Sequence, residues 1–444
     1  MQQTIFGTDG IRASFGTHLL TIENSIALGF ALGAWLRIRA NNQAVTLYIA
    51  RDSRISGDII QSSIQIGLLA NGITIHDTGI MPISALFYGV THTHDAYGIM
   101  ISASHNLYTD NGIKIIGPNG KLTALDEQRI TAFFNYYRTS PYDYSVLTPE
   151  KLGTVHYASC IEQYRSYVCS RWPAHFLQGK KIVLDCANGA ASIIAPDIFK
   201  AYGADVISLH NTPNGTNINA ACGSTDPRMA QQAVIQHGAY AGFAFDGDGD
   251  RVVAIDAHGA LKDGDHILAL LAGTPDTQTA SVVGTVMSNS GLELFLKQRN
   301  KRLVRANVGE KAVLQMMQRE SASLGGEPSG HILLHEYMPS SDGIIAALAT
   351  LHAMEQINNH TMETFVPFAQ FNAAVTITHK KPLANSELQE IITRYEQQLQ
   401  HGRLVVRYSG TEPLLRIMVE EADDTLTQLI GTRLTEALKG ALQK

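Results

Sequence analysis

The stretch that decides the fold is KKIVLDCANGAASIIAPDIFKAYG, residues 180–203. An apolar run typical of a strand ends in a polar, glycine-containing turn, and a helical pattern follows. The same order of strand, turn and helix recurs in VTLYIARDSRISGDIIQSSIQIGLLANG, residues 45–72, and in SVVGTVMSNSGLELFLKQRN, residues 281–300. Strands that alternate with helices of about 10 to 15 residues predict α/β sandwiches with mixed or parallel sheets. Three copies of the pattern predict three similar α/β domains.

The domain organisation follows from length and from polar breaks in the pattern. A chain of 444 residues is too long for one core. Length alone suggests about three domains, and four small ones also fit. The predicted domains are residues 1–153, 154–256, 257–364 and 365–444. In the last segment QFNAAVTIT and LLRIMVEEA are typical of strands, and TLTQLIGTRLTEALKGAL of an amphipathic closing helix. The expected fold is therefore three related α/β sandwich domains with mixed sheets plus a smaller α+β C-terminal domain.

Composition excludes several classes of function. The net charge of -6 argues against nucleic acid or an anionic membrane as the main partner, since both need a basic surface. The longest apolar run, residues 26–36, is much shorter than the roughly 18 to 20 residues that span a bilayer, so a buried helix capped by Thr21 is predicted. No secretory signal pattern is seen at Met1. Cys160, Cys169, Cys186 and Cys222 lack CxxC spacing, which fits a reducing cytosol and a cytoplasmic protein.

A short polar loop after an apolar strand presents a candidate nucleophile. In GIMISASHNLYTDNGIKI, residues 98–115, the apolar run ends at small polar residues that include Ser104 and His105. Ser104 does not lie in a G-x-S-x-G turn, and no hydrolase triad is nearby in the sequence, which disfavours acyl transfer. Two loops further along the chain, one acidic and one rich in arginine and hydroxyl groups, could hold a metal ion and a phosphate. A serine that meets them favours phosphoryl transfer, where the protein mainly positions groups and neutralises charge.

An acidic loop between two apolar strands predicts a metal site. AGFAFDGDGDRVVAID, residues 241–256, spaces Asp246, Asp248 and Asp250 by glycines. Two such charges about 4 Å apart repel by roughly 4 kcal/mol at an effective dielectric constant of 20, so the cluster needs a cation. Oxygen ligands alone favour Mg2+. An EF-hand loop is excluded because Arg251 and Ala257 stand where it needs Gly and Glu, and a solvated acidic turn is the remaining alternative.

Two further loops offer groups for a phosphorylated sugar. In SLGGEPSGHILL, residues 323–334, glycines frame Glu327, Ser329 and His331, which can hydrogen-bond a polyol, although a structural role for His331 is the alternative. RYSGTEPLLRIMVE, residues 407–420, combines arginines, hydroxyls and a glycine into a phosphate cradle of Arg407, Ser409, Gly410 and Thr411. An ordinary turn is the alternative there. Neither a Walker loop nor a dinucleotide fingerprint is present, so ATP and NAD are not indicated.

These four loops in this order, with FGTDGIR at residues 6–12, resemble the α-D-phosphohexomutase superfamily over nearly the whole chain. Within it the sequence is most similar to the bacterial phosphoglucosamine mutases, through DCANGA, PNGTNINAACGST, TVMSNSGLE and DGIIAAL. The resemblance implies four domains around a central cleft, each contributing one loop. It also implies that a phosphorylated Ser104 interconverts glucosamine 6-phosphate and glucosamine 1-phosphate through a 1,6-bisphosphate, which also serves as primer. The product would supply UDP-N-acetylglucosamine and cell-wall precursors.

The resemblance also implies a role for each site residue. One Mg2+ would be held by Ser104 and the three aspartates, Asp246, Asp248 and Asp250. Arg12 and Lys114 would lie at the reaction centre, with Lys114 or His331 moving the proton. His105 and Arg251 would steady the phosphoryl group. Glu327 and Ser329 would bind sugar hydroxyls, and Arg407, Ser409, Gly410 and Thr411 the phosphate that is not reacting. The only implied partner is a small sugar phosphate, and the chain would be a monomer or homodimer.

Three alternatives stay open on the sequence. The nearest is a phosphomannomutase or phosphoglucomutase, because Pro328 stands where phosphoglucosamine mutases more commonly carry Gln, and proline removes an N–H and a side-chain amide. Leu107 replaces the usual proline after ASHN, a change that bears on the rigidity of the loop that carries Ser104 and not on the choice of sugar. The second alternative is a sugar-phosphate binding protein without catalysis. The third, a phosphatase, is disfavoured because a cleft that retains a bisphosphate must exclude water.

Overall fold

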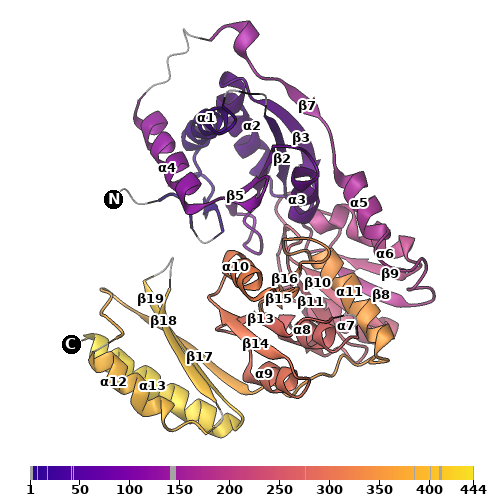
Figure 1. Cartoon of the computed structure of the whole chain (residues 1–444), viewed down its shortest axis with the longest axis vertical. Helices are drawn as coiled ribbons and strands as arrows, with labels where there is room; N and C mark the ends of the chain where they lie inside the picture. Colours follow the sequence, from indigo (N-terminus) through magenta and orange to yellow (C-terminus); the bar gives the residue numbers. More distant parts are fainter. Residues whose placement is uncertain are drawn as a thin grey trace.

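The computed structural model describes every residue except 1–3, 8, 18, 42, 44, 141–146, 276, 385, 401, 410–412 and 444. The chain forms four α/β units in sequence order. The first three pack together, and the fourth lies beside the third (Figure 1).

The first unit is built on a mixed sheet with the strand order β1-β5-β4-β2-β3-β7, and β6 pairs with β5. β2 is parallel to β3 and β4, whereas β5 is antiparallel to β4 and β1. The strands are β1 (Ile11–Ser14), β2 (Thr46–Arg51), β3 (Thr74–Ile80), β4 (Ala96–Ile101), β5 (Asp110–Gly117), β6 (Gly120–Lys121) and β7 (Val155–Tyr157). The helices are α1 (Ile22–Arg39), α2 (Gly57–Ala70), α3 (Ile83–Thr91) and α4 (Ala124–Thr139), and a 3-10 turn covers Pro149–Lys151.

Helix α1 forms where the apolar run predicted it. The Thr21 side chain accepts a hydrogen bond from the N–H of Asn24, and Glu23 lies in the first turn. Arg37 and Arg39 lie in the last turn, where positive charge complements the helix dipole. Most of the helix is buried, as expected for a run that is apolar on nearly every side.

The second unit carries the acidic loop. Its sheet has the order β12-β11-β10-β8-β9, with β8 parallel to β9 and β10, and β11 antiparallel to β10. The strands are β8 (Lys181–Asp185), β9 (Asp205–Leu209), β10 (Ala241–Phe245), β11 (Val252–Ile255) and β12 (Leu261–Lys262). The helices are α5 (Ile161–Cys169), α6 (Ala195–Ala201) and α7 (Arg228–His237), with a 3-10 turn at Ala190–Ile193.

The third unit repeats this plan with the strand order β14-β13-β15-β16. β13 is parallel to β14 and β15, and β16 is antiparallel to β15. Its strands are β13 (Ser281–Thr285), β14 (Arg302–Ala306), β15 (Leu324–Gly326) and β16 (Ile332–Leu334). Its helices are α8 (Gly264–Ala272), α9 (Ser290–Lys297), α10 (Glu310–Glu320) and α11 (Gly343–Gln356).

The fourth unit is smaller and of α+β type, as predicted. Its antiparallel sheet has the order β17-β19-β18, and the helices pack against it over a separate core. The elements are β17 (Ala369–Thr376), α12 (Glu387–Glu396), β18 (Arg403–Tyr408), β19 (Leu414–Glu421) and α13 (Asp424–Gln443). None of the helices in the described part of the chain is both long and apolar enough to cross a membrane.

The first three sheets share one plan, which confirms the repeat seen in the sequence. The corresponding runs are β3-β2-β4-β5, β9-β8-β10-β11 and β14-β13-β15-β16. In each run the last connection joins a parallel strand to an antiparallel one, and this connection carries a candidate loop. One apolar core runs through all three units and includes Leu86 of α3, Phe243 of β10 and Leu348 of α11. The repeated connections are therefore held in fixed relation to one another, and the predicted fold class is confirmed.

Candidate active site

Ser104 is a buried residue in strained backbone directly after β4. Its φ of 53° lies in the left-handed region, which is uncommon for a residue other than glycine. Its Oγ donates a hydrogen bond of 2.6 Å to Oδ2 of Asp246 in the second unit. The N–H of Ser104 donates to Oγ of Ser102 at 2.8 Å. The loop therefore points the predicted nucleophile at the acidic loop.

Two residues that sequence reasoning did not single out hold this loop in place. The buried guanidinium of Arg54 donates to the carbonyl oxygens of Ser104 and Asn106, each at 2.8 Å. Nδ2 of Asn219, from the second unit, donates to the same two carbonyls at 2.8 and 2.9 Å. The sequence signals for them were the place of Arg54 in the repeated stretch at residues 45–72 and the place of Asn219 in PNGTNINAACGST, which resembles the superfamily.

The three predicted aspartates form a compact buried cluster. One ligand atom from each of Asp246, Asp248 and Asp250 lies within 4.8 Å of the others. Burial, and then the charges of Asp250 and Asp248, raise the pKa of Asp246 to about 8. Oδ1 of Asp248 is buried without a hydrogen-bond partner. These features fit a hard divalent cation, because an ion would supply the charge and the ligand contacts that the cluster lacks.

Gly247 allows the acidic loop to approach the serine loop. A Cβ at this position would lie 2.5 Å from the carbonyl oxygen of Ser104 and 2.9 Å from Nδ2 of Asn219. No side chain fits in that space without moving one of the two loops. The glycine spacing of DGDGD therefore has a packing reason besides the placement of the carboxylates.

Lys114 reaches the acidic cluster from β5. Its Nζ lies 2.8 Å from Oδ2 of Asp248 and 3.0 Å from Oδ2 of Asp250. A third carboxylate oxygen, Oδ2 of Asp9 in FGTDGIR, lies 2.9 Å away. Burial lowers the pKa of Lys114, but the three carboxylates together raise it well above its ordinary value. The ammonium group therefore carries its charge among the aspartates.

His331 faces the same cluster from the third unit. Its Nδ1 lies 2.7 Å from Oε2 of Glu327, and its Nε2 lies 3.3 Å from Oδ1 of Asp250. Arg251 lies between the second and third loops, with Nε 3.0 Å from Nε2 of His331. Burial and Arg251 lower the pKa of His331, but Asp250 and Glu327 raise it to about 9. Ser329, in the same loop, is exposed.

Arg12 and His105 border the serine loop. Arg12 lies on β1, and its Nη1 donates to Oδ1 of Asn106 at 3.4 Å. Nδ1 of His105 is buried without a hydrogen-bond partner. Burial, and then the charges of Arg251 and Arg12, lower the pKa of His105 to about 4. His105 is therefore a neutral imidazole beside two guanidinium groups.

The fourth loop begins at the end of β18, on the side of the fourth unit that faces the first unit (Figure 1). Arg407 of β18 stands directly opposite Arg416 of β19. Like charges directly opposite each other destabilise a sheet, so an anion between them is favoured. Both arginines line a cavity that also includes Met287 from the third unit. Ser409, two residues after Arg407, is buried, whereas Gly410 and Thr411 lie outside the described residues.

The loops of the first three units thus meet at one point, and the fourth presents paired arginines. A buried serine that is hydrogen-bonded to an acidic cluster and flanked by a lysine and a histidine defines an enzyme of the phosphoryl-transfer class.

Comparison with known proteins agrees with this class. The sequence matches "Phosphoglucomutase/phosphomannomutase, alpha/beta/alpha domain I" over residues 3–140, domain II over 157–259, domain III over 263–369 and the C-terminal domain over 372–437. The chain belongs to the phosphoglucomutase/phosphomannomutase family.

Individual relatives agree over the full length. A phosphoglucosamine mutase of Acinetobacter baumannii (strain ACICU) is 39% identical over 447 residues, which cover 99% of both chains. A solved structure of a phosphoglucomutase/phosphomannomutase family protein from Burkholderia thailandensis has a TM-score of 0.81 at 19% identity, covering 99% of this chain and 98% of that one. The Aspergillus fumigatus N-acetylphosphoglucosamine mutase, solved with GlcNAc-6P and magnesium, has a TM-score of 0.64 at 17% identity, covering 98% and 96%. The two solved structures support the fold.

Proposed function

We propose that this chain interconverts glucosamine 6-phosphate and glucosamine 1-phosphate through a phosphorylated Ser104. The observation that carries the proposal is the 2.6 Å hydrogen bond from Ser104 Oγ to Asp246, which joins a candidate nucleophile to the acidic cluster. The choice of amino sugar rests on the phosphoglucosamine mutase relatives that are 39% identical over 99% of the chain.

In the proposed reaction the bond between phosphorus and Ser104 Oγ breaks as a bond forms to the free hydroxyl of the sugar phosphate. Lys114 or His331, which flank Asp250 at 3.0 and 3.3 Å, would give its proton to the departing oxygen of Ser104 and, once uncharged, take the proton of the sugar hydroxyl. The resulting 1,6-bisphosphate turns over, and its other phosphate returns to Ser104, so no phosphate is consumed. Arg407 and Ser409, with Gly410 and Thr411, would hold whichever phosphate is not reacting.

Asp246, Asp248 and Asp250, with the oxygen of Ser104, would hold a Mg2+ ion. The ion would offset the negative charge on the phosphoryl group. Arg12, His105 and Arg251 border the same point and would orient the phosphoryl oxygens. Glu327 and Ser329 would bind sugar hydroxyls.

The proposal also covers the domain bounds, the oligomeric state and the cellular location. We propose four domains around the cleft, in a monomer or homodimer. The expected bounds are 1–153, 154–256, 257–364 and 365–444, but β7 pairs with β3 and β12 pairs with β11, so the first two domains extend to about residues 157 and 262. A cytoplasmic location is supported by the free thiols of Cys160, Cys169, Cys186 and Cys222.

The deciding experiment compares three substrates in one tube. The protein is incubated with Mg2+, a trace of hexose 1,6-bisphosphate and equal glucosamine, mannose and glucose 6-phosphates, and the 1-phosphates are followed by phosphorus NMR. Glucosamine 1-phosphate should form first, and Ser104→Ala should form none. Faster formation of mannose 1-phosphate or glucose 1-phosphate would instead indicate a phosphomannomutase or phosphoglucomutase, the alternative that Pro328 leaves open. Absence of any 1-phosphate would favour a binding protein, and free phosphate would favour a phosphatase.

A further inference from the structure

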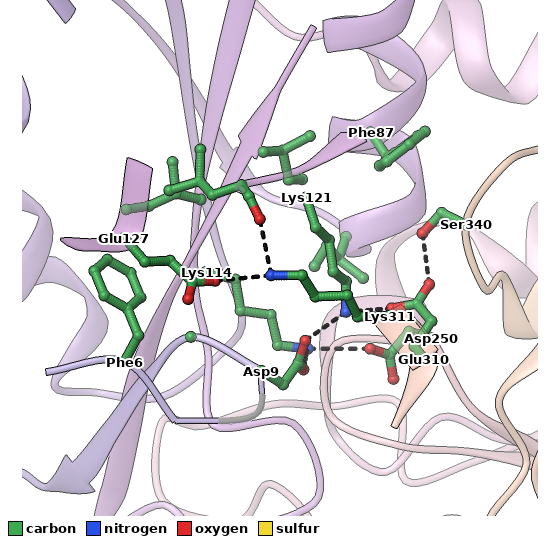
Figure 2. A pocket seen from close by; sticks show the side chains of 15 residues that line it. Phe6, Asp9, Phe87, Lys114, Lys121, Glu127, Asp250, Glu310, Lys311 and Ser340 are labelled. Atoms are coloured by element: carbon green, nitrogen blue, oxygen red, sulfur yellow. Dashed lines mark hydrogen bonds and ion pairs between the residues drawn. The ribbon is translucent and has the colours of Figure 1, made fainter. Parts of the chain in front are cut away.

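A charged cavity between the first and third units contains groups that the proposed reaction does not use (Figure 2). We propose that Asp9, Lys121 and Glu310 form a clasp between the two units that positions Lys114 and the Glu327–His331 pair on opposite sides of Asp250. The three are positioning residues, since each acts through Lys114 or the sugar loop. The inference rests on the proposed function for its catalytic consequence and on the contacts below for its structural one.

Lys121 is the centre of the clasp. Its Nζ lies 2.5 Å from Oδ1 of Asp9 in its own unit and 2.5 Å from Oε2 of Glu310 in the third unit. The other oxygen of Asp9, Oδ2, lies 2.9 Å from Nζ of Lys114. Asp9 therefore links the lysine at the reaction centre to the lysine that reaches the third unit, as Figure 2 shows.

Glu310 fixes the other end. It is the first residue of α10 and is buried. Its Oε1 accepts hydrogen bonds from the N–H of Ser341 at 2.7 Å and the hydroxyl of Ser340 at 3.1 Å. The preceding residue, Gly309, donates its N–H to Oε1 of Glu327 at 2.9 Å. The start of α10 thus connects the clasp to the sugar loop.

These contacts close a ring around the reaction centre. Glu327 holds Nδ1 of His331 at 2.7 Å, and His331 and Lys114 both reach Asp250. The clasp connects Lys114 to the start of α10, whose Gly309 contacts Glu327, and so closes the ring. Lys121 and Asp9 are 24% and 29% exposed, and Glu310 is buried. Loss of one link would leave a charge of the ring without its partner and let the third unit shift relative to the first. A shift of about 1 Å at reacting groups can cost roughly 100-fold in rate.

A neighbouring ion pair provides a matched control. Lys311, the next residue of α10, donates to the carbonyl oxygen of Leu122 at 2.9 Å and to Oε1 of Glu127 at 3.1 Å. This pair joins the same two units from the same helix turn, and its side chains are 34% and 26% exposed. The hydrogen bonds and the ion pair of Lys311 go to Leu122 and Glu127 and not to Asp9 or Lys114, so the pair lies outside the ring.

The test compares Glu310→Gln, Lys121→Gln, their double variant and Lys311→Gln. We expect each clasp variant to lose about 10- to 100-fold in kcat with KM changed by less than about threefold. The double variant should be no slower than the slower single variant, because both break one connection. Lys311→Gln should stay within about twofold of the parent. Clasp variants within twofold of the parent, an additive double variant or an equal loss in Lys311→Gln would overturn the clasp.

A second measurement keeps the clasp testable whatever the substrate. Hydrogen exchange at amides of the Glu327–His331 loop should accelerate in Glu310→Gln and not in Lys311→Gln, because only the first disturbs the ring. Equal exchange in the two variants would overturn the inference. If the parent acts on mannose 6-phosphate and not on glucosamine 6-phosphate, the proposed function fails while the clasp is tested on the active substrate. If the clasp variants misfold on melting analysis, Asp9→Asn takes their place, with the same expectations.

Discussion

At the scale of single residues, a buried polar atom without a hydrogen-bond partner indicates where a ligand would bind. Asp248 illustrates this, because one of its oxygens pairs with Lys114 while the other is buried and has no hydrogen-bond partner. A buried carboxylate oxygen left in this way is costly unless a cation or a donor reaches it. The residue is therefore the most direct point at which to test the metal assignment.

Asp248→Asn should lower kcat by about 100-fold or more, the order seen when charge stabilisation at a reacting centre is lost. The amide keeps the shape of the carboxylate but removes its negative charge, so binding of Mn2+ in place of Mg2+, followed by electron paramagnetic resonance, should weaken in parallel. Asp226→Asn, which changes a partly exposed carboxylate paired with Arg228 at the start of α7, is the matched control. If Asp248→Asn turned over as fast as the parent at saturating Mg2+, the metal assignment would be refuted.

Asn219→Ala tests whether the carbonyl contacts hold the serine loop. The change removes hydrogen bonds to the carbonyls of Ser104 and Asn106, of a kind worth roughly 1 kcal/mol each. We expect transfer of phosphate from a bisphosphate to Ser104 to slow by about 30-fold, in line with the roughly 2 kcal/mol of the two bonds lost. Asn214→Ala, an exposed change in the same segment, should leave this rate unchanged. Equal rates in Asn219→Ala and the parent, measured by mass of the phosphorylated chain, would count against a positioning role.

At the scale of elements, the sequence predicted what is local. The repeated strand and helix pattern, the capped α1 and the four loops could all be predicted, because each depends on residues close together in the chain. Arg54 and Asn219 could not be assigned roles, since they reach Ser104 across 50 and 115 residues of sequence. Lys121 and Glu310 meet only after two units have packed. Long-range contacts of this kind follow from tertiary packing, which a single sequence pattern does not encode.

Gly247→Ala tests the close packing of two loops. The added Cβ would lie 2.5 Å from the carbonyl oxygen of Ser104, so one loop must move away from the other. We expect kcat to fall by about 100-fold, because the distance between Ser104 and the aspartates changes. Gly440→Ala is the control, since its Cβ meets open space in α13 and should stabilise the helix by up to about 1 kcal/mol. An active Gly247→Ala enzyme would show that the loops tolerate separation.

At the scale of the whole molecule, the fourth unit is joined to the third by a small polar connection. Arg403 donates to the carbonyl oxygens of Val286 and Ser288 at 2.7 and 2.6 Å and pairs with Glu420 at 3.1 Å. Glu420 in turn accepts the N–H of Ser290 at 3.0 Å. The core of the fourth unit is separate from the core shared by the other three. This connection therefore sets where Arg407 and Arg416 stand relative to Ser104.

Arg403→Ala should loosen that connection and raise KM with a smaller change in kcat. Arg407 and its neighbours would still bind a phosphate, but part of the binding energy would be needed to bring the fourth unit into place. We expect KM to rise by about five- to tenfold for both the 1-phosphate and the 6-phosphate, because in the proposed reaction the same arginines would serve both orientations. Arg407→Ala should raise KM in the same direction, and Arg433→Ala, an exposed change in α13, should not. A fall in kcat with unchanged KM in Arg403→Ala would mean that the connection shapes the reacting groups themselves, and that the fourth unit does more than hold the distant phosphate.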